Sequence, residues 1–277
     1  MSKCTYKWDD VEFHKTFQPQ DSYISKIMEL ACNEYSGTKE EISSLTGIPT
    51  GKTSGKVIPH IRYAAFMGFI DYQKNGSVYT LSLTPLGKIV VREDKYLLEN
   101  VTRLIAHYFI TDPENGALIW SFIYRSLPYR IDDSISDSLI NSKFSEVFQH
   151  DGKDNLNVVK RSYMEGFWQK LRLINWDSEL CLNGQIYNEE YKYLYAYTLL
   201  KDWEKYRSNE RELTVIQLSD ELCWNKRLGF DDTETMNVLD ELAAEGIISV
   251  NKQLHPCTIV RSECSDNFID KSYDLLT

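Results

Sequence analysis

Metal-ligand and thiol-redox patterns are missing from this sequence of 277 residues. Its six cysteines stand singly with no CxxC pair, which excludes a zinc ribbon and a thiol-redox motif. The five histidines are equally dispersed, and no HExxH or HxH spacing brings two of them onto one helix face. We therefore expect no cofactor and no dedicated transition-metal site, and we interpret the cysteines as small buried hydrophobic residues.

Long apolar runs are also missing. No stretch approaches the ~20 apolar residues that a membrane-spanning helix needs, and residues 1–10 lack the apolar core of a signal peptide. With 7 Pro, 13 Gly, 42% hydrophobic and 26% charged residues, the composition excludes disordered, collagen-like and coiled-coil proteins. We expect a cytoplasmic globular protein without a membrane partner.

The motifs of common catalytic classes are not found. The sequence has no Gly-rich phosphate loop, no GxSxG elbow, no kinase signature and no HNH-like cluster. A Mg²⁺-dependent nuclease needs converging carboxylates, often with a lysine. Glu190 and Lys192 form a Glu-x-Lys fragment, but it lies in a helical pattern without an Asp on a preceding strand. The residues alone therefore leave open whether the protein is an enzyme, and catalytic residues are not identified.

Positive charge is scarce overall but locally enriched. The net charge is −10, so bulk attraction to nucleic acid is excluded. Residues 38–95 carry eight Lys/Arg against five acidic residues, a local charge of +3 that leaves −13 for the remainder. An acidic body with one basic module is compatible with a directed DNA contact.

The amino-terminal part predicts a winged helix-turn-helix. A periodic apolar pattern predicts a helix over residues 21–35, and the Thr38–Glu41 capping box starts a second helix over 38–46. Pro59 in a first turn predicts a third helix from 55–58 to Gly68. Strands over 69–73 and 77–83 then flank an Asn-Gly turn, and Thr84-Pro85 begins another helix.

In a winged helix the third helix enters the major groove. We predict that one face of this helix points outward, that the residues before it offer backbone N–H groups to a phosphate, and that the wing tip adds a cation. The predicted DNA-contacting residues of this module are Lys52, Thr53, Ser54, Lys56, His60, Arg62, Tyr63 and Lys74. The alternative is a protein-docking or purely structural module.

Residues 97–212 predict helices rich in aromatic residues that form a core. One stretch interleaves cations with aromatic rings, as single-strand binders do when bases stack on rings. An amphipathic helix with a basic outer face gives the same pattern, so both interpretations stay open. The stretch contains Lys160, Arg161, Tyr163, Phe167, Trp168, Lys170 and Arg172.

Residues 213–261 repeat the first pattern more faintly. We predict helices over 213–224 and 231–245, followed by strands over 247–250 and 257–261. The second of these helices carries acidic residues and no cation, so a basic protein surface is its expected partner. The predicted fold class is mainly α (α+β), with two winged helix-turn-helix modules flanking a helical middle region. The predicted domains are 1–96, 97–212 and 213–277.

Two short motifs carry a family resemblance. Residues 13–17, Phe-His-Lys-Thr-Phe, followed by Ile-Ser-Lys at 24–26, resemble the opening of a bacterial family of unknown-function proteins, and Trp120-Ser121-Phe122 is similar to that family's aromatic helix. Residues 18–23 lack the Arg and Trp that the family usually shows there. Members occur in DNA phosphorothioation and phage-defence gene clusters, beside a cysteine desulfurase and a sulfurtransferase of the PAPS-reductase type, and include the SspB-like DNA-nicking component.

The resemblance implies a protein that engages double-stranded DNA so that sulfur can be placed in the backbone, and it allows for nicking of one strand with Mg²⁺. It places His14 and Lys15 near the phosphate, although His14 is equally interpretable as a structural histidine that fixes the amino-terminal arm. Three functions therefore stay open. They are a DNA-binding component that works with other proteins of a modification complex, a non-enzymatic adaptor of the sulfur-transfer enzymes, and a dimeric transcriptional regulator.

Overall fold

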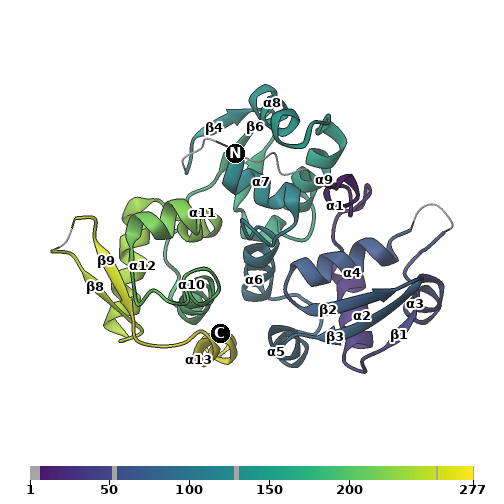
Figure 1. The fold of residues 1–277 in the computed structure, drawn as a ribbon, viewed down its shortest axis with the longest axis horizontal. Helices are drawn as coiled ribbons and strands as arrows, with labels where there is room; N and C mark the ends of the chain where they lie inside the picture. Colours follow the sequence, from purple (N-terminus) through teal and green to yellow (C-terminus); the bar gives the residue numbers. More distant parts are fainter. Residues whose placement is uncertain (1–6, 52–54, 128–130, 254, 277) are drawn as a thin grey trace. The chain divides into compact units, whose positions relative to one another are not determined.

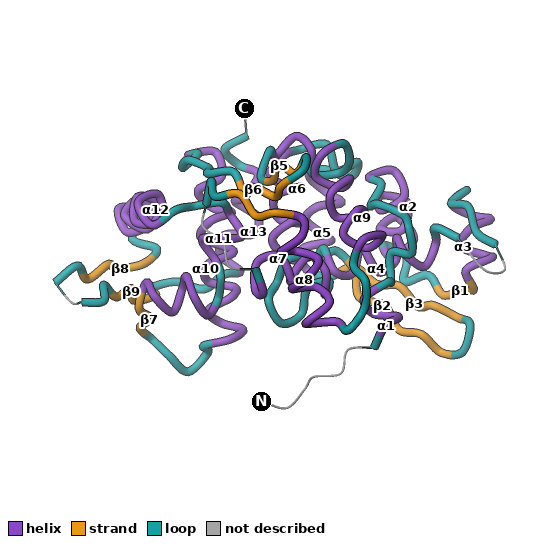
Figure 2. The backbone as a smooth tube through the Cα atoms, turned by 90° about the horizontal axis from the view of Figure 1, so that it is seen from above, coloured by secondary structure: helices purple, strands orange, loops and turns teal. Residues whose placement is uncertain are grey.

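The computed structural model describes residues 7–51, 55–127, 131–253 and 255–276. Helices outweigh strands, and the strands form three small three-stranded sheets (Figure 2). The predicted mainly α (α+β) class is therefore confirmed. Within the described ranges, no helix has both the length and the apolar character needed to cross a membrane.

The chain divides into two compact units. Unit 1 comprises residues 1–127 and 135–180, and unit 2 comprises residues 128–134 and 181–277. The predicted boundaries at 96/97 and 212/213 fall inside unit 1 and unit 2, respectively.

The first part of unit 1 has the predicted order of three helices and a hairpin (Figure 1). Strand β3 lies between β1 and β2 and pairs antiparallel with both. The elements are α1 (Trp8–Val11), α2 (Asp21–Ala31), β1 (Ser36–Thr38), α3 (Lys39–Thr46), α4 (Val57–Phe66), β2 (Ile70–Asn75), β3 (Val78–Leu83) and α5 (Pro85–Glu93).

Local signals in the sequence explain these boundaries. The Thr38 hydroxyl accepts the Glu41 N–H at 3.3 Å, and the Glu41 carboxylate accepts the Thr38 N–H at 2.7 Å, so the capping box starts α3 as predicted. Thr84 caps α5 by accepting the Gly87 N–H at 2.9 Å. The hairpin is also confirmed, although β2 continues through Asn75 and the loop is Gly76-Ser77, with Gly76 at φ +61°.

The middle of the chain contains a sheet that the predicted helical region lacks. Its strands are only three or four residues long, too short for an alternating pattern to show in the sequence. Their order is β4-β6-β5, so the last strand is again central. The elements are α6 (Asn100–Ile110), α7 (Leu118–Ser126), β4 (Ser134–Ser136), α8 (Asp137–Phe148), α9 (Lys153–Met164), β5 (Ile174–Trp176) and β6 (Glu179–Leu182).

Unit 2 repeats the arrangement once more, with strand order β7-β9-β8. The helix predicted over 213–224 is confirmed only in part, because the segment begins with β7 and is then helical, with a π-helical turn over Gln217–Glu221. The other elements are α10 (Lys192–Tyr206), β7 (Glu212–Thr214), α11 (Trp224–Leu228), α12 (Asp232–Ala244), β8 (Ile248–Asn251), β9 (Thr258–Arg261) and α13 (Asp266–Ile269).

The same order of elements thus occurs three times. A helix, a strand, two helices and two strands follow one another in residues 21–83 and, with one additional helical turn each, in residues 118–182 and 192–261. In each case the first strand pairs with the last one. The prediction of this arrangement at only the two ends of the chain missed the central copy.

Aromatic rings fill the core of unit 1. Tyr163 stacks on Trp168 with ring centroids 5.1 Å apart, and its hydroxyl lies 2.6 Å from Nδ1 of His107. Phe167 is buried beside them. The hypothesis that bases stack on these three rings is therefore wrong, because the rings are inside the protein.

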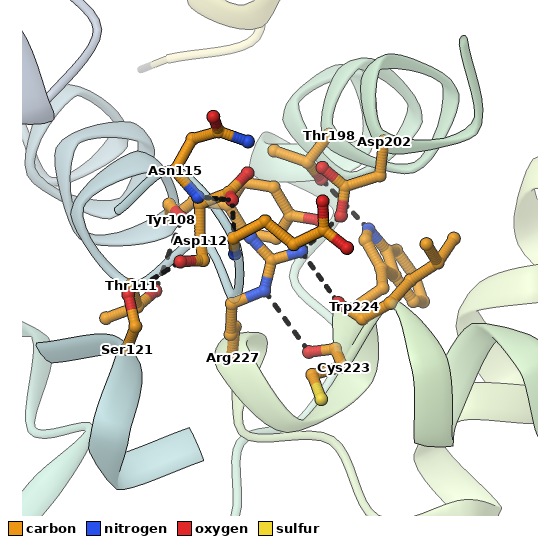
Figure 3. A network of polar contacts seen from close by, with 12 residues as sticks. Tyr108, Thr111, Asp112, Asn115, Ser121, Thr198, Asp202, Cys223, Trp224 and Arg227 are labelled. Carbon is orange, nitrogen blue, oxygen red and sulfur yellow. Dashed lines mark hydrogen bonds and ion pairs between the residues drawn. The ribbon is translucent and has the colours of Figure 1, made fainter. Parts of the chain in front are cut away.

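Several buried polar groups in each unit form hydrogen bonds or ion pairs (Figure 3). In unit 1 the Ser121 hydroxyl donates to the Asp112 carbonyl at 2.6 Å. In unit 2 Arg227 and Asp202, which are 0% and 4% exposed, form an ion pair. The indole N–H of Trp224 donates to the Thr198 hydroxyl at 3.1 Å. Such satisfied groups fix the packing of the helices that carry them.

Candidate nucleic-acid interface

The amino-terminal arm, residues 12–20, covers the face of α4 that we predicted to point outward. The Tyr63 hydroxyl donates to the Phe17 carbonyl at 2.8 Å, and the Phe13 ring lies 4.9 Å from the Tyr63 ring. The Gln20 N–H donates to Nε2 of His60 at 3.2 Å. His60 and Tyr63 are both 0% exposed. The predicted exposure of these two residues is wrong, because the chain's own arm occupies their face.

The environment of His60 keeps its ring neutral. Nδ1 lies 2.7 Å from the Lys56 carbonyl and Nε2 accepts the Gln20 N–H, so the proton sits on Nδ1. Burial lowers the pKa of His60 to about 4, although the hydrogen bond to the Lys56 carbonyl opposes this shift. The residue is therefore a structural link between the arm and α4.

The cations predicted around α4 have different surroundings. The Lys56 ammonium lies 5.5 Å from the Phe17 ring centroid and 5.3 Å from that of Tyr23. Arg62 is 18% exposed at its side chain and pairs with Asp10 at 2.8 Å. Lys74 is exposed in strand β2 of the hairpin. The predicted residues Lys52, Thr53 and Ser54 lie outside the described residues.

His14 is fully buried, so the predicted position beside a phosphate is wrong for it. Its ring packs edge-on against Trp120 with centroids 5.9 Å apart. Asn155 lies beside the ring, but neither ring nitrogen makes a hydrogen bond of standard geometry within the described chain. Burial, with smaller contributions from the charges of Lys15 and Arg161, lowers the pKa of His14 to about 4. These contacts favour the structural interpretation of His14.

Lys15 is exposed, unlike the buried His14 beside it. It has a left-handed backbone at φ +55° and an exposed side chain whose Nζ lies 3.8 Å from Glu12. The contact of Lys15 with DNA stays a prediction.

Helix α9 presents the open polar face of unit 1. Its buried positions include Leu156, Val159 and Tyr163, which turns the opposite side outward. The α9 face, as we define it, consists of four residues of that outer side and the nearby arm lysine, namely Lys153, Asn157, Lys160, Arg161 and Lys15. The exposed carboxylate of Asp154 lies next to it on the same helix.

Two contacts hold the α9 face in place. Nη2 of Arg161 donates to the Thr16 carbonyl at 2.9 Å, which ties the arm to the helix. The Lys160 ammonium donates to the Asp177 carbonyl in the turn between β5 and β6. The sequence singled out Lys160 and Arg161, whereas the spacing of Lys153 and Asn157, at i and i+4, was the signal that we missed.

A cavity of about 290 Å³ lies beside this face, between α8, α9 and β5. Ile140, Leu156 and Trp176 are its buried apolar residues. The indole N–H of Trp176 donates to Oδ1 of Asp137 at 2.8 Å, which orients this carboxylate. The polar lining consists of Asp137, Asn141, Lys153, Asp154, Asn157 and Lys160.

No known family model and no curated protein sequence matches this chain. Its fold, however, is that of two crystal structures. Magnesium ion-bound SspB superposes with a TM-score of 0.74 at 13% identity, covering 95% of this chain and 88% of that chain. A second SspB structure superposes with a TM-score of 0.72 at 14% identity and the same coverage.

This chain shares the SspB fold. The likeness confirms, at the level of fold, the resemblance predicted from residues 13–17 and the aromatic helix around Trp120. It extends over 95% of this chain, so it is not confined to one copy of the repeated arrangement.

The magnesium ion of that SspB structure raises the question of whether this chain has a matching site. The described residues contain no group of three or more His, Cys, Asp and Glu that could hold a metal ion. The two carboxylates of the cavity, Asp137 and Asp154, share it with two lysines. These residues do not form a magnesium site of their own.

The acidic face of α12 in unit 2 is present as predicted. Asp232, Asp240 and Glu241 are exposed, and the helix contains no Lys or Arg. Lys252 pairs with Asp240 at 2.7 Å and Lys192 with Glu245 at 2.7 Å, which neutralises only part of the face. Phosphate is repelled from such a surface.

Proposed function

We propose that this protein is a DNA-contacting component of a bacterial phosphorothioation modification and defence system. The α9 face carries this proposal, because Lys153, Lys160 and Arg161 lie together on the second helix of the central repeat. In this proposal the repeats are winged-helix modules, α9 is the helix that enters the major groove, and β5–β6 is the wing. The SspB fold and the family resemblance supply the biological context.

The chemistry of the α9 face suits a duplex. Lysine and arginine contact phosphate oxygens, and an exposed asparagine on a groove-facing helix can pair with the edge of adenine. Lys153 and Asn157 are exposed one helical turn apart, so one can contact the backbone while the other reaches a base. Lys74, outside the α9 face, is proposed as a further phosphate contact.

The covered face of α4 explains why the contact is assigned to α9. A recognition helix must offer side chains to base edges. Those of His60 and Tyr63 are hydrogen-bonded or packed within the protein.

The proposal is tested by fluorescence anisotropy of a labelled duplex at 50–250 mM salt. Because log affinity falls with a slope of roughly −0.9 per phosphate neutralised, three to four cations of the α9 face predict a slope of about −3. A duplex that does not bind at 50 mM salt, or a slope near zero, contradicts the proposal.

Strand nicking is a separate proposal that rests on the family resemblance. It is tested by incubating supercoiled plasmid with the protein and Mg²⁺, beside a chelator control. Conversion to the open circle only when Mg²⁺ is present supports nicking, and intact supercoiled plasmid in both reactions contradicts it.

The acidic face of α12 favours a second candidate function, an adaptor for sulfur-transfer enzymes. Its carboxylates suit a basic protein surface. The test is binding of the purified cysteine desulfurase and sulfurtransferase from the same gene cluster, with Asp240→Ala and Glu241→Ala as variants. Unchanged binding of both enzymes by the variants contradicts a role for this face.

A further inference from the structure

The cavity beside α9 combines groups of opposite charge in a small space. Lys153 and Lys160 line it together with Asp137 and Asp154. Two carboxylates disfavour a bare phosphate, and two ammonium groups disfavour a bare cation. A fitting ligand is anionic at one end and carries hydrogen-bond donors at the other.

The volume of the cavity and its apolar floor indicate which class of ligand fits. Its volume of about 290 Å³ is at the lower limit for small-molecule pockets, so it suits one planar ring with its phosphate. Ile140, Leu156 and Trp176 are 0%, 4% and 3% exposed and provide an apolar floor. A flat aromatic ring buries apolar area against such a floor.

The polar lining suits the edge of a nucleobase. Carboxylate oxygens accept hydrogen bonds from exocyclic amino groups, which adenine, cytosine and guanine have and thymine lacks. Asp137 is oriented by Trp176 through one oxygen, Oδ1. The amides of Asn141 and Asn157 add both donors and acceptors.

We infer that this cavity receives one unpaired nucleotide of a DNA strand, with its base against the apolar floor and its phosphate beside Lys153 and Lys160. The inference rests on the proposed function, because the α9 face is what brings a strand to the cavity. Lys153, Asn157 and Lys160 belong both to that face and to the cavity lining, so the two are continuous. An unpaired base enters at lower cost than a paired one, since it is not held in a base pair.

The test compares three ligands. They are a fully paired duplex, the same duplex with one bulged nucleotide, and the free deoxynucleoside monophosphate, each monitored by protein tryptophan fluorescence and by anisotropy competition. A bulged dA, dC or dG is expected to bind about tenfold more tightly than the paired duplex or a bulged dT.

Two variants distinguish nucleotide binding in the cavity from duplex binding by the α9 face. Asn141→Phe fills the cavity from α8, outside the α9 face, and is expected to abolish the preference for the bulge while paired duplex binding persists. Asp154→Ala removes an exposed acceptor and is expected to reduce the preference for amino-bearing bases at least threefold. Lys143→Ala is the matched control, since Lys143 lies on α8 outside the cavity and is expected to change neither.

Equal affinities for paired and bulged duplexes overturn the inference while the proposed function stands. A preference that persists in a folded Asn141→Phe protein also overturns it, and Asp154→Ala decides if Asn141→Phe does not fold. If the free monophosphate competes as effectively as the bulged duplex, the cavity binds free nucleotides, and the inference that its nucleotide belongs to a DNA strand is overturned. If no duplex binds at all, the proposed function fails as well.

Discussion

The Tyr63 hydroxyl donates a 2.8 Å hydrogen bond to the carbonyl of Phe17, which joins α4 to a segment 46 residues earlier in the chain. With the bond from the Gln20 N–H to His60, it closes the arm over a helix face that the local sequence presents as open. Tyr63→Phe should therefore destabilise the protein by about 1 kcal/mol, because a partly buried hydrogen bond is lost. Urea unfolding measures this loss. Tyr96→Phe, at a residue 64% exposed, is the control and should stay within about 0.5 kcal/mol of wild type.

The two buried histidines make stability depend on pH. Burial lowers the pKa of both His14 and His60 from 6.5 to about 4. The unfolded chain then binds more protons than the folded one between these values, so stability falls as the pH drops from about 6.5 towards 4. Each histidine should contribute a slope of up to about 1.4 kcal/mol per pH unit.

Unfolding by urea at pH 7, 5.5 and 4.5 measures this dependence. His60→Asn and His14→Asn should each flatten it, whereas His150→Ala, at an exposed residue, should leave it unchanged. If the pH dependence of the unfolding free energy is the same in His60→Asn and His14→Asn as in wild type, the two rings are protonated in the folded state.

Gly87 marks a close approach between α5 and the end of α4. A Cβ atom at this position would lie 1.8 Å from the Phe69 carbonyl oxygen, which also accepts the Thr84 N–H at 3.1 Å. Gly87→Ala should therefore cost about 3 kcal/mol or more, because either the helix or this carbonyl must shift. Lys88→Ala, at the exposed neighbouring position, is the control for thermal unfolding. Equal midpoints for the two variants would contradict the close approach.

The Arg227–Asp202 pair in unit 2 is buried on both sides. Replacing one member leaves the other charge without its partner, so Asp202→Asn or Arg227→Met should each destabilise the protein by about 3–5 kcal/mol. The double variant should lose less than the sum of the single losses. A double-mutant cycle on unfolding free energies measures this coupling, and strictly additive losses would show that the pair does not interact.

Features set by neighbouring residues were predictable from the sequence. The Thr38–Glu41 capping box, the Thr84-Pro85 start of α5 and the hairpin at Gly76 all depend on local chemistry, and the structure confirms each. The acidic exposed face of α12 was also predictable, because helical spacing alone places those residues.

Features set by distant residues were not predictable. Strands β4 and β5 have three residues each, so their pairing depends on the sheet and not on a local pattern. Exposure of His60 was predicted from helical spacing, but residues 12–20 cover that face. Lys153 and Asn157 were not predicted as contact residues, because the central repeat that contains α9 is recognisable only from the pairing of β5 and β6.

The salt dependence of duplex binding by two lysine variants tests the central claim most directly. Lys153→Ala and Lys160→Ala should each reduce the slope of log affinity against log salt by about one, because each removes one phosphate contact. Lys143→Ala, which removes an exposed cation paired with Glu146 on α8, should leave the slope unchanged. Equal slopes for wild type and all three variants would contradict a DNA contact through α9.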